Sequence, residues 1–262
     1  MIKIAISGAG GRMGRRVAAM AVASREFQIV AAVEAAGHET IGKDVGELAG
    51  QTRIGVKVAA ELTGRPDVLI DFSAPAGALA CLAASRRERL ALVLGTTGLT
   101  DIQQAEVADA ARDIPILQSA NMSVGVNVLL KLAAQAAVAL GPDYDVEITE
   151  TLHRFKKDAP SGTAIALARS ICAALGKDYG ASAVFGRGGM GSRKPGEIGL
   201  HALRMGDTVG EHTVQFGNLG ETITFGHSAH TRDTFAAGAL RAAAWIAGKP
   251  AGLYTMADVL GL

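Results

Sequence analysis

The sequence predicts an α/β fold in two parts: a Rossmann-like domain built on a doubly wound parallel sheet, and a second α+β domain with a mixed, mainly antiparallel sheet. In the first half of the chain, short apolar runs alternate with helix-like stretches, which is the order of a parallel sheet covered by helices. After 140–142, turn signals separate strand-like runs instead. The apolar runs of the first half are 2–7, 27–33, 67–72, 90–94 and 114–118.

The composition is that of a globular protein with a sizeable core. The chain has 262 residues, of which 49% are hydrophobic, and its mean hydropathy is +0.25. A chain of this length and composition can form one large domain or two small ones, and either could bury a hydrophobic core. A formal net charge of +1 gives no electrostatic ground for binding nucleic acid or an anionic membrane, so we expect neither as a partner.

The cysteines and the chain start bear on the cellular compartment. Cys81 and Cys172 lie inside predicted helices without C-x-x-C spacing, so we expect free thiols and no metal site. The chain enters its first apolar run at Ile2 without a signal-peptide pattern. The most apolar predicted helix, 124–140, carries Lys131 and two amide side chains, which argues against a membrane span. We therefore expect a cytoplasmic protein.

A glycine loop follows the first apolar run. The loop 8–14 reads G-A-G-G-R-M-G and leads into a helix-like stretch at 15–23; the next run, 27–33, ends in Glu34. Strand, glycine loop, helix, strand and acid in this order predict a dinucleotide site, although the spacing is G-x-x-G-x-x-G rather than G-x-G-x-x-G. The alternative is a tight turn between strand and helix. The residues expected to contact the cofactor are Gly8, Ala9, Gly10, Gly11, Arg12 and Met13.

Glu34 bears on the choice of cofactor. A carboxylate at this position accepts from the ribose hydroxyls of NADH and repels the 2′-phosphate of NADPH. Ala35 follows where a base would hold that phosphate, although Arg12 could reach it. We therefore expect NADH to be preferred and NADPH to be possible. The alternative for Glu34 is a solvated acid at the end of a strand.

Further loops are expected at the same edge of the sheet, where ligands of doubly wound folds bind. They occupy 73–75, 95–98 and 119–122, and Thr100 with Gln103 forms a capping-box pattern at the next helix start. Each loop alone could be a plain turn; their shared edge favours the cofactor. The residues expected on the cofactor side are Gly95, Thr96, Thr97, Ser119, Ala120, Asn121 and Met122.

The second half contains strand-like runs at 183–185, 199–205, 208–216 and 221–228, which predict the mixed sheet. Between them, 186–196 is a glycine-rich basic loop that we expect to be flexible; a role in covering the site stays open. A helix is predicted at 231–247, followed by a short run to the end of the chain.

A candidate anion site begins where the strand 145–150 ends. His153 and Lys156 follow it with two further cations, and then Ser161-Gly162-Thr163 opens a helix that is expected to stop at Gly176. Ser161 is a good N-cap, and free backbone N–H groups beside cations are a natural site for a carboxylate or phosphate. The alternative is a solvated basic loop before an ordinary capped helix.

The segment 150–164, which reads E-x-x-H-x-x-K-x-D-A-P-S-G-T-A, resembles the signature of the 4-hydroxy-tetrahydrodipicolinate reductase (dihydrodipicolinate reductase) family. The family pattern differs in having E-x-H-H at its start. The resemblance extends to G-A-G-G-R-M-G-R, D-F-S-x-P, L-G-T-T-G, S-A-N-M-S-V-G-V-N, G-D-T-V-G-E-H-T and H-S-A-H-T-R-D-T-F-A, and so spans essentially the whole chain.

The resemblance implies an oxidoreductase that uses NADH or NADPH to reduce 4-hydroxy-tetrahydrodipicolinate, a small dicarboxylate, to tetrahydrodipicolinate in lysine and diaminopimelate biosynthesis. It implies a cofactor domain formed by 1–123 together with the C-terminal segment 233–262. It also implies a substrate-binding domain at 124–232, through which four copies of the chain associate as a homotetramer. Lys156 would be the proton donor. The implied substrate contacts are His153, Ser161, Gly162, Thr163 and Arg232; for Arg232, the alternative is a surface arginine at a domain hinge.

Leu152 departs from the family pattern, because it stands where the family has its proton-transferring histidine. Leucine cannot transfer a proton, so we expect a slow but genuine reductase in which Leu152 packs and the proton comes from Lys156, from His153 or through water. Two alternatives stay open: a non-catalytic homologue that binds or senses the cofactor, and a Rossmann dehydrogenase of another small acid or sugar.

Overall fold

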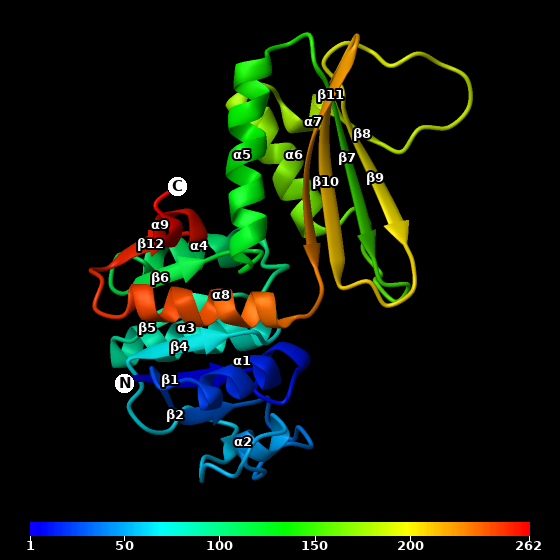
Figure 1. Cartoon of the computed structure of the whole chain (residues 1–262). Coiled ribbons are helices and arrows are strands. Elements are labelled where there is room, and N and C mark those ends of the chain that lie inside the picture. Colours follow the sequence, from blue (N-terminus) through cyan, green and yellow to red (C-terminus); the bar gives the residue numbers. More distant parts are fainter. The chain divides into compact units, whose positions relative to one another are not determined.

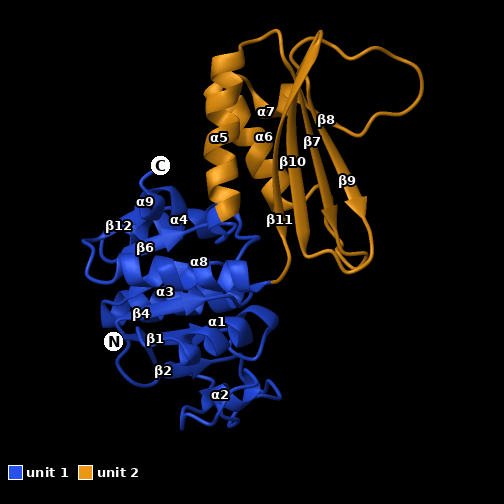
Figure 2. Ribbon diagram, in the orientation of Figure 1, with its two compact units in different colours: residues 1–124, 232–262 blue, residues 125–231 orange.

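The computed structural model describes residues 1–262, which divide into two compact units (Figures 1 and 2). Unit 1 comprises 1–124 and 232–262, and unit 2 comprises 125–231. None of the helices combines the length and the apolar character needed to cross a bilayer.

Unit 1 contains a seven-stranded parallel sheet with the order β12-β6-β5-β4-β1-β2-β3, which confirms the predicted doubly wound fold. The order reverses between β1 and β4, and ligands of such sheets bind at this reversal. The strands are β1 (Ile2–Ser7), β2 (Phe27–Val33), β3 (Val58–Ala59), β4 (Val68–Asp71), β5 (Ala91–Leu94), β6 (Pro115–Gln118) and β12 (Gly252–Tyr254).

Helices cover both faces of this sheet because its strands are apolar on both sides. On β1, Ile4 and Ile6 pack toward α1 and α8, whereas Ala5 packs toward α3 and α4. The capping box of Thr100 and Gln103 is present at the start of α4, as predicted. The helices of unit 1 are α1 (Arg12–Ala23), α2 (Val45–Leu48), α3 (Pro75–Glu88), α4 (Asp101–Ala110), α8 (Asp233–Ile246) and α9 (Met256–Leu260).

Unit 2 contains a mixed sheet with the order β11-β10-β7-β9-β8. β10 pairs antiparallel with β11 and β7, whereas β7–β9 and β8–β9 are parallel. The β7–β9 pair is parallel because α6 crosses over between these strands, and the loop 186–197 returns the chain between β8 and β9. The strands are β7 (Asp145–Leu152), β8 (Ala183–Phe185), β9 (Ile198–Arg204), β10 (Gly210–Asn218) and β11 (Glu221–Ala229).

Two long helices, α5 (Val124–Leu140) and α6 (Gly162–Ala174), lie on one face of the unit 2 sheet (Figure 1). A short helix, α7 (Tyr179–Ser182), precedes β8. Ile148 of β7 and Phe216 of β10 are fully buried in the core that these elements share. Gly176 follows the end of α6 with a φ of +65°, which agrees with the predicted helix stop. Both cysteines are buried and free, as expected.

Candidate active site

The glycine loop of unit 1 owes its shape to two positions where a side chain would not fit. Gly8 has a φ of +71°, and a Cβ built on Gly14 would lie 2.1 Å from the Gly8 carbonyl oxygen. Gly14 therefore allows α1 to pack closely on the loop, which is the role of the third glycine in the G-x-G-x-x-G pattern.

The helix after this loop starts earlier than predicted, at Arg12 rather than 15, so Arg12 and Met13 belong to its first turn. Gly11 occupies the N-cap position and has no side chain that could satisfy the first backbone N–H groups. These groups remain available to an anion, and a dinucleotide pyrophosphate fits such a helix start.

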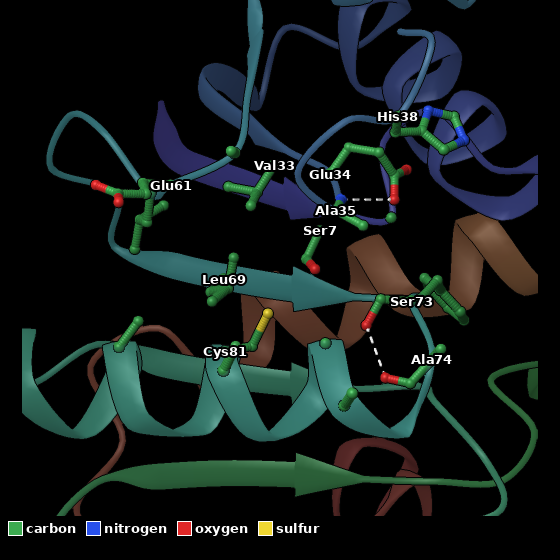
Figure 3. Close-up of a pocket in the computed structure, with 18 of the residues that line it drawn as sticks. Ser7, Val33, Glu34, Ala35, His38, Glu61, Leu69, Ser73, Ala74 and Cys81 are labelled. Atoms are coloured by element: carbon green, nitrogen blue, oxygen red, sulfur yellow. Dashed lines mark hydrogen bonds between the residues drawn. The ribbon is translucent and has the colours of Figure 1, made fainter. Parts of the chain in front are cut away.

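A cavity of about 740 Å³ adjoins the loop and is lined by Gly8, Gly11 and Glu34 among others. The Glu34 carboxylate accepts from Gly10 N at 2.9 Å and from Ala35 N at 3.0 Å. Figure 3 shows Glu34 and Ala35 facing Ser73 and Ala74 across the cavity. The volume is in the range of cofactor sites. The sequence did not indicate the apolar side chains that line this cavity, which include Val33, Leu69, Phe72 and Ala80.

A fully buried carboxyl group, Asp71 at the end of β4, supports the neighbouring loop. Its side chain accepts from Thr96 Oγ1 at 2.5 Å and from Ser73 Oγ at 2.6 Å, while its backbone oxygen accepts from Gly95 N at 2.9 Å. Because the Thr96 hydroxyl is turned inward, the loop presents backbone groups and the exposed Thr97 instead. In the sequence, Asp71 stood out only as the first residue of the D-F-S-x-P motif, without a role of its own, although its place at the end of a buried strand was a signal.

The loop after β6 is held by its own side chains. Ser119 Oγ donates to the Asn121 carbonyl oxygen at 2.8 Å, and Asn121 Oδ1 accepts from Ser123 N at 2.9 Å. Ala120 is exposed, whereas Met122 is buried in the core of unit 1. Of these four expected cofactor residues, Met122 therefore cannot offer its side chain to a ligand.

Arg232 lies in unit 1 at the N-cap of α8, near Arg12. Burial lowers the pKa of Arg232, and the positive charge of Arg12 lowers it further. Asp233 is already occupied by a two-pronged ion pair with Arg16, whose shorter distance is 2.5 Å. The two guanidinium groups at 12 and 232 form no ion pair, so an anion is favoured close to them.

In unit 2, β7 ends at Leu152, whose side chain is 8% exposed and lies on the same strand face as Ile148 and Glu150. The leucine thus packs, as expected. Beyond it, Lys156 Nζ pairs with Asp158 Oδ1 at 2.8 Å, and this bond lowers the pKa of Asp158. His153 keeps its Nδ1 buried without a hydrogen-bond partner.

The predicted N-cap is present: Ser161 Oγ accepts from Ala164 N at 3.2 Å. Gly162 begins α6, and its Cβ position faces open space, so a ligand could approach the first turn. The structure thus brings Ser161, Gly162 and Thr163 together at one helix start. Lys156 and His153 belong to the loop that leads to it.

A buried polar cluster beneath this helix start was missed by sequence reasoning. The Glu150 carboxylate is 1% exposed and lies 2.8 Å from Arg204 Nη2 and 3.6 Å from His212 Nε2. Burial raises its pKa, but hydrogen bonds from His212, Ser161 and Arg204 outweigh burial and hold the pKa at about 2. The signals in the sequence were an acid on the apolar face of a strand and its place as the first residue of the segment 150–164.

Known proteins resemble this chain over both its N-terminal and its C-terminal part. Family models described as dihydrodipicolinate reductase, N-terminus and C-terminus, match residues 2–122 and 125–260. The 4-hydroxy-tetrahydrodipicolinate reductases of Geotalea uraniireducens (strain Rf4) and Geobacter sp. (strain M21) are 47% and 46% identical, with 100% of each chain covered. A dipicolinate-bound dihydrodipicolinate reductase from Paenisporosarcina sp. TG-14 is 25% identical, with a TM-score of 0.77 over 98% of both chains.

Proposed function

This chain belongs to the dihydrodipicolinate reductase family, and we propose that it reduces 4-hydroxy-tetrahydrodipicolinate to tetrahydrodipicolinate in lysine and diaminopimelate biosynthesis. One observation carries this proposal. The same chain has a glycine loop with an uncapped helix start in unit 1, which suits a dinucleotide, and a capped helix start beside cations in unit 2, which suits a carboxylate. Relatives that share this whole length are named for that reaction.

The cofactor of the family is a nicotinamide dinucleotide, which supplies the hydride when it is bound. The residues of unit 1 fit it: Gly8 and Gly14 let the loop pack closely against the Phe72 backbone and the first turn of α1, and the start of α1 offers N–H groups to phosphate. Glu34 would hold the adenosine ribose. The loops after β5 and β6 would hold the nicotinamide half.

Within this proposal NADH is preferred. The Glu34 carboxylate disfavours a 2′-phosphate, and Ala35 offers no base in its place. Arg12 at the glycine loop and Arg87, which lines the same cavity as Glu34, are cations that could reverse this preference. Dissociation constants for both cofactors test it, and tighter binding of NADPH would contradict the role assigned to Glu34.

The substrate is a dicarboxylate and needs two anion sites. We assign one carboxylate to the helix start at Ser161–Thr163 with His153, and we keep Arg232 as a contact for a substrate carboxylate. N–H groups of a first helical turn and charged side chains both bind carboxylates well. The dipicolinate that is bound to the Paenisporosarcina relative is a ligand of the same class.

Lys156 is the proposed proton donor, since Leu152 has no proton to give.

A second candidate function follows from Leu152 alone: a homologue that binds the cofactor without turnover. The experiment that separates the two mixes the protein with substrate made in situ from pyruvate and aspartate semialdehyde and follows the loss of nicotinamide absorbance. Folded protein that oxidises neither cofactor above background would sink the reductase proposal.

We also propose a homotetramer joined through the unit 2 sheet, and a cytoplasmic setting in which the two thiols stay reduced. In support, the large apolar side chains of Phe185 on β8 and of Leu203 on β9 are exposed. Light scattering of the purified protein measures the mass; a monomer would contradict the tetramer.

A further inference from the structure

Glu150 lies near the end of β7, and its register neighbours are His212 on β10 and Ala202 on β9. The side chain points to the face of the sheet that carries α6, where Ile148 is part of the apolar core. A carboxylate in this place is costly to bury, and an apolar side chain would fill it more simply. Its hydrogen bonds indicate what it does there.

Both carboxylate oxygens accept from one backbone group, Ser161 N, at 3.1 Å and 3.0 Å. Ser161 is the N-cap of α6, so this contact places the first residue of the proposed anion site. The bond is buried, which makes it stronger than the same bond in water.

Arg204 extends the attachment to the other end of the loop. Its Nη2 donates to Glu150 Oε1 at 2.8 Å and to the Asp158 carbonyl oxygen at 2.7 Å. One carboxylate thus holds the segment 158–161 at both ends: directly at Ser161, and through the guanidinium at Asp158. His212 Nε2 lies 3.2 Å from Ser161 Oγ, so Ser161 is held through its side chain as well as through its backbone N–H.

We propose that Glu150 is a positioning residue of this reductase: through Ser161 and Arg204 it sets where the first turn of α6 and the loop before it present their donors to a substrate carboxylate. This inference rests on the proposed function, because it takes the start of α6 as the carboxylate site. Glu150 itself does not touch the substrate.

The test is Glu150→Gln, which keeps the size of the side chain and removes its charge. The probe is dipicolinate, measured by titration calorimetry without turnover. We expect its dissociation constant to rise by about tenfold or more, the size expected for a lost charged hydrogen bond, while the dissociation constant of NADH is unchanged. In steady-state assays KM for the substrate rises more than kcat falls.

The matched control is Glu147→Gln. Glu147 lies on the same strand, points to the opposite face and is also paired with two arginines, Arg187 and Arg193. This variant should bind dipicolinate like the parent. If Glu147→Gln weakens binding as much as Glu150→Gln does, or if Glu150→Gln weakens NADH and dipicolinate equally, the role is merely structural and the proposal fails.

Arg204→Lys provides a second test of the same contact in case Glu150→Gln does not fold. It keeps the positive charge beside Glu150 but replaces the planar guanidinium with a point charge. We expect weaker dipicolinate binding with NADH binding retained; binding equal to the parent would overturn the inference. Binding and turnover are read separately, so a parent that binds dipicolinate but shows no reductase activity contradicts the proposed function alone.

Discussion

Asp71 in unit 1 and Glu150 in unit 2 are both buried carboxyl groups at the carboxyl ends of strands, yet they are satisfied in different ways. Asp71 accepts hydrogen bonds from neutral groups, the hydroxyls of Ser73 and Thr96, and forms no ion pair. Glu150 accepts from the guanidinium of Arg204 as well as from the Ser161 backbone. Around these two carboxyl groups, unit 1 thus supplies neutral polar partners, whereas unit 2 supplies a charged one.

This difference has a physical basis in the proposed ligands. A dinucleotide is long and needs close approach to the backbone, so shape decides its binding. A small dicarboxylate offers little surface, so charged hydrogen bonds decide its binding. We therefore expect unit 1 to be sensitive to added volume and unit 2 to changes of charge and pH.

The largest expected effect is that of Lys156→Ala, which removes the proposed proton donor from unit 2. General acid catalysis is worth roughly 10²–10⁴-fold, and we expect kcat to fall by about that factor while NADH binding is retained. Lys157→Ala, at the exposed neighbouring lysine, is the control and should be near the parent rate. A Lys156→Ala enzyme that keeps most of its activity would show that the proton comes from elsewhere.

Acid should weaken unit 2 through Glu150. Its pKa is lowered from 4.5 to about 2, so its contribution is complete above about 4.5 and disappears as the pH falls toward 2. A shift of this size corresponds to about 3 kcal/mol. Urea unfolding of the parent and of Glu150→Gln between neutral and acid pH measures it. The stability difference should shrink with acid, and a constant difference would contradict the assignment.

Unit 1 should respond to volume instead, and Gly14→Ala tests this. The added Cβ would lie 2.1 Å from the Gly8 carbonyl oxygen, so the loop must shift. Overpacking costs about 1–3 kcal/mol, which corresponds to roughly 10–100-fold weaker NADH binding if the loop absorbs it. The loss should not depend on pH. Gly188→Ala, where a Cβ meets open space, serves as the control.

The smallest expected effect is a gain. Leu152→His restores the histidine of the family pattern at the end of β7, and we expect turnover to rise by at least about tenfold with little change in substrate affinity. The leucine is 8% exposed, so the unfolding free energy of the variant is measured alongside. An unchanged rate in an enzyme that is already fast would show that this position carries no proton.

Local patterns determined much of the fold. The apolar run of β1, the alternating apolar residues of β7, and the capping residues Thr100 and Ser161 can be identified from neighbouring positions. Strand faces and helix ends depend on nearby residues. The glycine loop belongs to the same class. Its helix start at Arg12 was misjudged because the loop and the first turn of a helix have the same composition.

Only the tertiary structure decided which side chains meet. Arg204 lies 54 residues beyond Glu150 in the chain, and Thr96 lies 25 residues beyond Asp71. The parallel pairing of β7 with β9 is what brings Arg204 alongside β7. Such pairings depend on the packing of whole elements around a core, which no local period encodes, so the contacts of both buried carboxyl groups became visible only in the folded chain.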